Sequence, residues 1–132
     1  MLQNSRAFSS FAVRDLDAAR KFYAETLGVE VSDVPGMRGI FQLELAGGVR
    51  VLVYPKPDHT PATFTVLNFP VESVERTHAA LAERGVRFDV YKEGPVKTDA
   101  KGISSAGGGP KIAWFRDPSG NILSILEQRQ GD

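Results

Sequence analysis

The stretch WFRDPSGNILSILE (Trp114–Glu127) combines a turn with two strand-like flanks. The segment DPSG at 117–120 fits a type I turn, because Asp favours the first position, Pro fixes φ at the second and Gly favours the fourth. Apolar-rich runs lie on both sides, so the whole stretch predicts a β-hairpin. Such a hairpin can simply close a sheet, or it can direct an inward side chain toward a bound metal or ligand.

Length and composition indicate a soluble globular domain. The chain has 132 residues, of which 42% are apolar and 24% are charged, and this is enough for a core without disulfides. Lys and Arg together number 16, as do Asp and Glu, so nucleic acid and anionic membrane are poor candidate partners. Cysteine is absent, which excludes thiolate chemistry. We find no membrane span and no secretory signal, and therefore expect a cytoplasmic protein.

The first half of the chain predicts a strand, a helix and three further strands. Asp15 is placed to cap the helix and Gly28 to end it. The apolar face of this helix, at helical spacing, consists of Leu16, Ala19, Phe22 and Tyr23. The strands are expected at residues 7–13, 29–31, 40–45 and 49–54.

After a proline-rich linker at residues 55–62, the order of predicted elements begins again. A new strand is followed by a helix that Ser73 is placed to cap. An offset of 58 residues places Val13 over Val71 and Asp15 over Ser73. Both halves predict a β-α-β-β-β unit, which is the pattern of a duplicated supersecondary unit.

The second half contains a long connection that the first half lacks. Gly85 is placed to end the second helix, and VRFDVY at 86–91 alternates in the manner of a strand. Residues 92–110 then form a polar stretch with five glycines, which is longer than most connections, and such loops are often lids. We therefore expect residues 92–110 to form a mobile flap.

Two stretches carry a resemblance to a known family: FAVRDLDAARKFYAETLGVEV at 11–31 and FRDPSGNILSILE at 115–127. With the repeat, they resemble the vicinal oxygen chelate superfamily, which includes glyoxalase I, extradiol dioxygenases, fosfomycin-resistance enzymes and bleomycin-resistance binding proteins. The resemblance implies an α+β fold in a single domain, with two βαβββ modules at residues 5–54 and 63–130. Their sheets would form a cupped, partly open β-barrel with helices on the convex face. It also implies a homodimer.

The resemblance also identifies the positions that bind a metal ion in the metal-dependent members. They fall on Phe8, on Val66 (or Thr65, counting back from Gly85) and on Ser124, whose counterpart in the first module is Val51. Divalent transition metals need imidazole, carboxylate or similar donors in converging positions. A shift of one residue along any of these strands brings no such donor. We therefore expect neither a metal nor another cofactor.

Three other residues could supply metal donors, and none is predicted to do so. His59 lies in the linker, where a turn residue is expected, and His78 lies near the buried face of the second helix, where a packing role is expected. Glu127 is three residues past Ser124 and so points to the opposite face of the strand. We expect Glu127 to be solvated.

The resemblance places the binding site in the concave cup, and strand alternation selects the side chains that line it. Most are apolar, with a few hydroxyl and amide groups, a lining that suits a flat hydrophobic or aromatic ligand. Trp114 is a candidate stacking surface. The predicted ligand-binding residues are Phe8, Ser10, Val51, Phe64, Val66, Asn68, Trp114 and Ser124. The alternative is that these residues simply fill the cup as core.

Three functions follow from these observations. The first is a metal-free binding protein, similar to the bleomycin-resistance branch, that sequesters a small hydrophobic or aromatic molecule. The second is an enzyme of the same superfamily, a glyoxalase-like lyase or a dioxygenase, which the missing metal ligands argue against. The third is a structural or interaction protein whose cup is filled.

Overall fold

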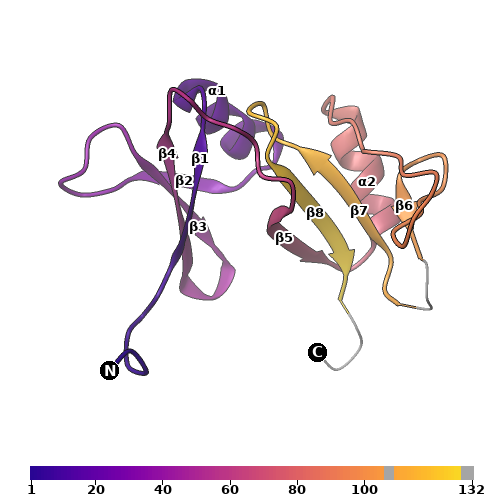
Figure 1. Ribbon diagram of the computed structural model, residues 1–132, viewed down its shortest axis with the longest axis horizontal. Coiled ribbons are helices and arrows are strands. Elements are labelled where there is room, and N and C mark those ends of the chain that lie inside the picture. Colours follow the sequence, from indigo (N-terminus) through magenta and orange to yellow (C-terminus); the bar gives the residue numbers. More distant parts are fainter. Residues whose placement is uncertain (106–108, 129–132) are drawn as a thin grey trace. The chain divides into compact units, whose positions relative to one another are not determined.

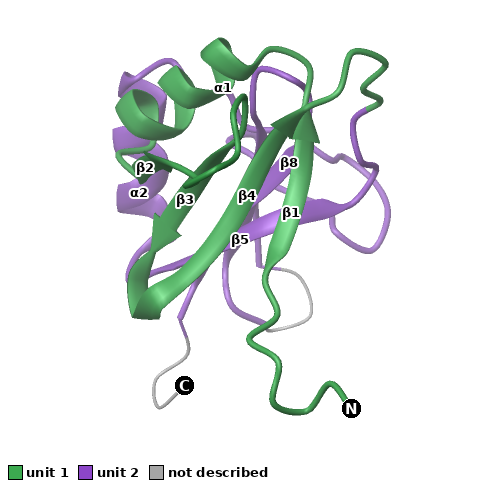
Figure 2. Ribbon diagram, turned by 90° about the vertical axis from the view of Figure 1, so that its left-hand side faces the viewer, with its two compact units in different colours: residues 1–60 green, residues 61–132 purple. Residues whose placement is uncertain are grey.

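Residues 1–60 and 61–132 form two compact units (Figure 2). The computed structural model describes residues 1–105 and 109–128. Each unit contains one four-stranded mixed sheet and one α-helix (Figure 1). No helix in these described ranges is long and apolar enough to cross a membrane.

The first unit has the order β1-α1-β2-β3-β4 along the chain. Its strands are β1 (Ser9–Val13), β2 (Glu30–Asp33), β3 (Phe41–Leu45) and β4 (Val49–Pro55), with α1 at Leu16–Lys21 and a π-helical segment at Phe22–Thr26. The strand order in the sheet is β1-β4-β3-β2. Strand β1 runs parallel to β4, and the other neighbours are antiparallel.

The second unit repeats this topology. Its elements are β5 (Thr65–Val71), α2 (Val74–Glu83), β6 (Ile103–Ser104), β7 (Ile112–Arg116) and β8 (Ile122–Glu127). The strand order is β5-β8-β7-β6, again with the first and last strands of the unit parallel. The predicted α+β fold of two βαβββ modules is confirmed. The described strands form two four-stranded sheets, and they do not close into a barrel.

Side-chain caps begin both helices, as the sequence predicts. The Asp15 carboxylate accepts a hydrogen bond from the Ala18 amide at 3.0 Å, and the Ser73 hydroxyl accepts one from the Arg76 amide at 3.2 Å. Helix α2 has a second cap, because Glu127 Oε2 accepts from the Val74 amide at 3.1 Å. The expectation of a solvated Glu127 is therefore wrong: this carboxylate binds a helix N-terminus, where negative charge is favoured.

Each sheet buries the face that its helix covers. In the first unit Phe11 contacts Tyr23 of the helical segment, with ring centroids 5.9 Å apart. In the second unit Phe88 lies between His78 of α2 and Phe115 of β7. The apolar side chains buried on the helix-covered faces include Phe11, Val13, Phe41, Leu43, Val51 and Val53 in one unit and Ala113, Phe115, Leu123 and Ile125 in the other.

The strand pairing at the edge of β7 that faces away from β8 differs from the prediction. Residues 86–91 are not a full strand: only Phe88 pairs there, in an isolated bridge with Phe115. The regular pairing belongs to β6, where Ile103 lies opposite Ala113, inside the segment expected to be a loop. Alternation marks residues able to join a sheet, but two segments share this one short edge, and the sequence pattern does not divide it between them.

Residues 92–105 of the expected flap carry hydrogen bonds of their own, and the mobility of the segment stays a prediction. The Thr98 amide donates to the Tyr91 carbonyl at 2.7 Å, and the Thr98 hydroxyl accepts from the Tyr91 amide at 2.9 Å. Asp99 accepts from the Ile103 amide at 2.9 Å, and these backbone bonds lower the pKa of the Asp99 carboxyl. The part of the predicted flap at 106–108 lies outside the described residues.

The turn between β7 and β8 depends on one buried carboxylate. Asp117 is buried, and its Oδ1 accepts from the amides of Ser119 and Asn121, each at 2.9 Å. Its Oδ2 accepts from the Asn121 side-chain amide at 3.0 Å. The Gly120 amide donates to the Asp117 carbonyl at 2.9 Å, which closes the predicted turn.

We expect Asp117→Ala to lower the free energy of unfolding by about 2–4 kcal/mol, because it removes three acceptor contacts and leaves buried donors unpaired. Urea denaturation followed by circular dichroism measures this. Asp58→Ala, at an exposed aspartate of the linker, is the matched control and should leave the free energy of unfolding nearly unchanged, because exposed ion pairs contribute little. Equal effects of the two substitutions would contradict this role of Asp117.

Candidate functional site

The sheet face opposite the helix carries one row of side chains in the first unit. Register pairs Ser10 with Leu52, Leu52 with Gln42 and Gln42 with Ser32, so these four residues cross the sheet on one face. We call them the first row. Their neighbours Phe11, Leu43, Val51 and Val53 belong to the buried core.

The second unit carries the equivalent row. Register pairs Asn68 with Ser124 and Ser124 with Trp114, and we call these three residues the second row. The offset of 58 carries Ser10 onto Asn68. The structure therefore brings together three of the predicted site residues, namely Asn68, Trp114 and Ser124.

Val51 does not belong to the first row. It pairs with Ser9, shares the face of Phe11 and is 4% exposed. The residue in register with Ser10, and hence equivalent to Ser124, is Leu52. The sequence alignment of β4 with β8 is off by one residue, because the pairing that sets the register joins distant segments and one step moves a side chain to the other face.

The remaining predicted residues lie at the strand starts. Phe8 and Phe64 each precede their strand by one residue and are 56% and 67% exposed. The Arg50 guanidinium lies 5.8 Å from the centre of the Phe8 ring. Val66 lies at an irregularity of the β5–β8 pairing, between Thr65 opposite Ile122 and Leu67 opposite Leu123.

A short hydrogen bond orders the polar part of the second row. The fully buried Ser124 hydroxyl donates to Asn68 Oδ1 at 2.5 Å. This bond orients the Asn68 amide, whose residue is exposed. The amide NH₂ group is a donor that a ligand carbonyl or hydroxyl can use.

Trp114 lies beside a second aromatic ring and an ion pair. The Tyr91 ring meets the Trp114 ring edge to face at 5.7 Å, a favoured geometry for aromatic pairs. The Tyr91 hydroxyl lies 3.4 Å from Asp89 Oδ2, which also accepts from Arg116 Nε at 3.0 Å. That hydrogen bond raises the pKa of Arg116. The residues predicted from the sequence do not include Tyr91, Asp89 or Arg116, because only folding brings residues 89–91 next to β7.

Gln42 is a further residue that sequence reasoning missed. It is 7% exposed, and its Nε2 donates to Ser32 Oγ at 3.1 Å. Its Oε1 is buried with no hydrogen-bond partner among the described residues, although buried polar atoms are usually paired. The signal was present in the sequence FQLEL, where an amide stands between two core residues.

Neither histidine forms part of a donor cluster. His78 stacks on Phe88 at 4.1 Å and donates from Nε2 to the Lys101 carbonyl at 2.8 Å, which confirms its packing role. The His59 amide closes a turn on Lys56, as expected, but the side chain is buried. In the described ranges, no three or more His, Cys, Asp or Glu side chains are grouped so that they could hold a metal ion.

Comparison with known proteins agrees with the duplicated fold. A family model described as the glyoxalase/bleomycin resistance protein/dioxygenase superfamily matches residues 7–125. This chain therefore belongs to the glyoxalase/bleomycin resistance protein/dioxygenase superfamily. No curated protein matches the chain.

Solved structures share the fold over nearly the whole chain. The antibiotic-binding protein TnmS3 from Streptomyces sp. CB03234 is 26% identical, with a TM-score of 0.67 and coverage of 96% of this chain and 99% of that one. A superfamily member from Sphaerobacter thermophilus is 23% identical, with a TM-score of 0.67 and coverage of 92% and 97%. The fosfomycin resistance protein FosX from Listeria monocytogenes is 13% identical, with a TM-score of 0.67 and coverage of 96% and 94%.

The face assignment of β4 can be tested with two substitutions. Val51→Thr places a hydroxyl in the core without changing shape, so we expect it to lower the free energy of unfolding by about 1–3 kcal/mol. Val49→Thr, on the same strand but 53% exposed, is the control and should be nearly neutral. Urea denaturation measures both. If Val51→Thr were neutral, Val51 would lie on the open face that the sequence alignment gave it.

Proposed function

We propose that this protein binds a small aromatic or hydrophobic molecule against the second row, without a metal ion. The observation that carries the proposal is the combination at that row: a partly exposed Trp114 braced by Tyr91, next to the Asn68–Ser124 pair. An aromatic wall beside a few oriented polar groups is the usual composition of a small-molecule site.

The polar groups suggest a ligand with its own hydrogen-bonding atoms. Asn68, an exposed residue, offers an amide donor, and the Ser124 hydroxyl holds that amide in place. A flat ligand that carries carbonyl or hydroxyl groups at its edge satisfies the amide and leaves its ring free to stack. The similarity to the antibiotic-binding protein TnmS3 supports a binding role.

The residues at the family's metal positions support metal-free binding. With the corrected register they are Phe8, Leu52, Val66 and Ser124. None of them carries an imidazole or a carboxylate, and Ser124 already donates its proton to Asn68. Phe64 and Val66, in the same unit as the second row, stay part of the proposed site, and Phe8 and Ser10 stay predictions of the sequence. The homodimer and the cytoplasmic location stay predictions of the sequence.

Trp114→Ala should weaken the binding of neutral aromatic ligands at least about tenfold, because loss of a stacked ring costs on the order of 1–1.5 kcal/mol or more. Isothermal titration with a neutral panel, such as naphthols, naphthoquinones and anthraquinones, measures this. Val49→Ala removes an exposed apolar side chain from the other unit and is the control. No heat and no thermal shift with the wild-type protein across the panel would instead favour a filled, structural face.

Metal analysis tests the second half of the proposal. The protein, purified without chelator and dialysed, should hold far less than one equivalent of Zn, Ni, Mn or Fe. Adding these ions should leave the melting temperature unchanged, since only an ion bound to the folded state raises it. One equivalent that survives dialysis would contradict metal-free binding and favour a lyase or dioxygenase.

A further inference from the structure

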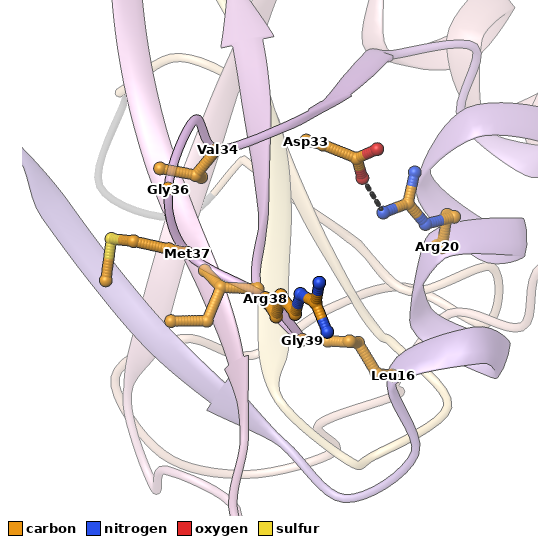
Figure 3. A pocket seen from close by; sticks show the side chains of 9 residues that line it. Leu16, Arg20, Asp33, Val34, Gly36, Met37, Arg38 and Gly39 are labelled. Atoms are coloured by element: carbon orange, nitrogen blue, oxygen red, sulfur yellow. Dashed lines mark hydrogen bonds and ion pairs between the residues drawn. The ribbon is translucent and has the colours of Figure 1, made fainter.

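A separate pocket opens in the first unit, beside α1 (Figure 3). Its walls come from the start and end of α1, through Leu16 and Arg20, and from residues 33–40, which connect β2 to β3. The pocket has a volume of about 460 Å³, within the usual range of roughly 300–1,000 Å³ for small-molecule sites.

The pocket lies on the opposite side of the sheet from the first row. Asp33 is in register with Phe41, a core residue on the helix-covered face, whereas Gln42 of the first row points to the other face. A ligand in this pocket therefore does not compete with one bound at the first row, and the inference does not rest on the proposed function.

Of the two arginines that line the pocket, one is paired with an aspartate and the other can bind a ligand. Arg20 binds Asp33, with Nη2 and Oδ1 2.6 Å apart, and its guanidinium lies 5.1 Å from the centre of the Phe41 ring. Arg38 has no ion-pair or hydrogen-bond partner among the described residues. Two arginines and one aspartate give the lining a net charge of +1, so the pocket as a whole favours an anion.

Apolar side chains surround these charges. Leu16, Val34, Met37 and Ile40 contribute to the lining, and Met37 is exposed. Met adapts its shape to apolar ligands because its side chain is unbranched and flexible. The lining thus combines one unpaired guanidinium, whose planar fork suits a carboxylate, with an apolar surface.

We propose that this pocket binds an organic carboxylate with an apolar body, its carboxylate held by Arg38 and its body packed against Leu16, Val34, Met37 and Ile40. Arg20 is already bound to Asp33 and holds the pocket wall. Asp33 stands near the anion and opposes its binding, because like charges repel. Arg38 and Asp33 are therefore expected to have opposite effects on the affinity for the carboxylate.

Titration of the full chain with 1-naphthoate, and with the neutral 1-naphthamide as the matched ligand, tests the charge requirement. We expect 1-naphthoate to bind at least about tenfold more tightly than 1-naphthamide, since a charge-assisted pair is worth at least about one tenfold step. Amide signals of Gly36 and Gly39 in two-dimensional NMR should move on addition of 1-naphthoate, which locates the ligand. No Gly36 and Gly39 shifts up to millimolar 1-naphthoate, or equal shifts of these two signals with both compounds, would overturn the proposal.

Two exposed substitutions test the residues. Arg38→Gln should weaken 1-naphthoate at least about tenfold and leave 1-naphthamide unchanged. Asp33→Asn, at a side chain 84% exposed, should strengthen 1-naphthoate severalfold, because it removes the repulsion and frees Arg20. Arg87→Gln, at an exposed arginine of the other unit, is the control for loss of a positive charge.

The Trp114→Ala protein should bind 1-naphthoate with the Gly36 and Gly39 shifts of the wild type. An Arg38→Gln protein that binds 1-naphthoate as well as the Arg87→Gln protein does would refute the site. So would an affinity for 1-naphthoate that Trp114→Ala abolishes, since the ligand would then be bound at the second row. Failure of neutral ligands to bind at Trp114 leaves this result unaffected, so the two proposals fail separately.

Discussion

Parallel pairing of the first and last strands of each unit is the constraint on which the rest of the structure depends. Parallel neighbours cannot be joined by a tight turn, so the chain between β1 and β4, and between β5 and β8, must cross one face of the sheet. In each unit the helix makes that crossing and covers that face. The same pairing brings Asn68 within 2.5 Å of Ser124, although 56 positions separate them. The open face is thus defined by the residues that the helix leaves uncovered.

The duplication keeps this architecture while the side chains on the open face diverge. Ser10 and Leu52 occupy the places of Asn68 and Ser124, and Gln42 occupies the place of Trp114. The first row therefore contains a buried amide with an unpaired oxygen, whereas the second row has at the equivalent place an indole braced by a phenol. Backbone pairing does not depend on these side chains, so they are free to specify a ligand.

Local sequence signals predicted the repeated elements. The errors of the prediction arose where the structure depends on contacts between distant segments. The helix caps and the terminating glycines act within one helical turn of their own position. Asp15 and Ser73 begin the helices, and Gly28 and Gly85 follow the helical ends, as expected. The one-residue error at Val51 arose because the register of β4 depends on hydrogen bonds to a distant strand. The cap that Glu127 places on α2 joins residues 53 positions apart. Such contacts leave no periodic pattern in the sequence.

The connection from β2 to β3 shows how a fold of this kind gains a second concave surface. Gly36 and Gly39 both adopt positive φ, at 76° and 73°, which glycine tolerates and other residues resist. These turns let residues 33–40 leave the sheet beside α1 and form the wall of the pocket. The repeated sheets offer neutral aromatic and amide groups on their open faces, whereas this non-repeated turn offers a guanidinium on the helix side. Different ligand charge, rather than different shape alone, therefore separates the two sites that we propose.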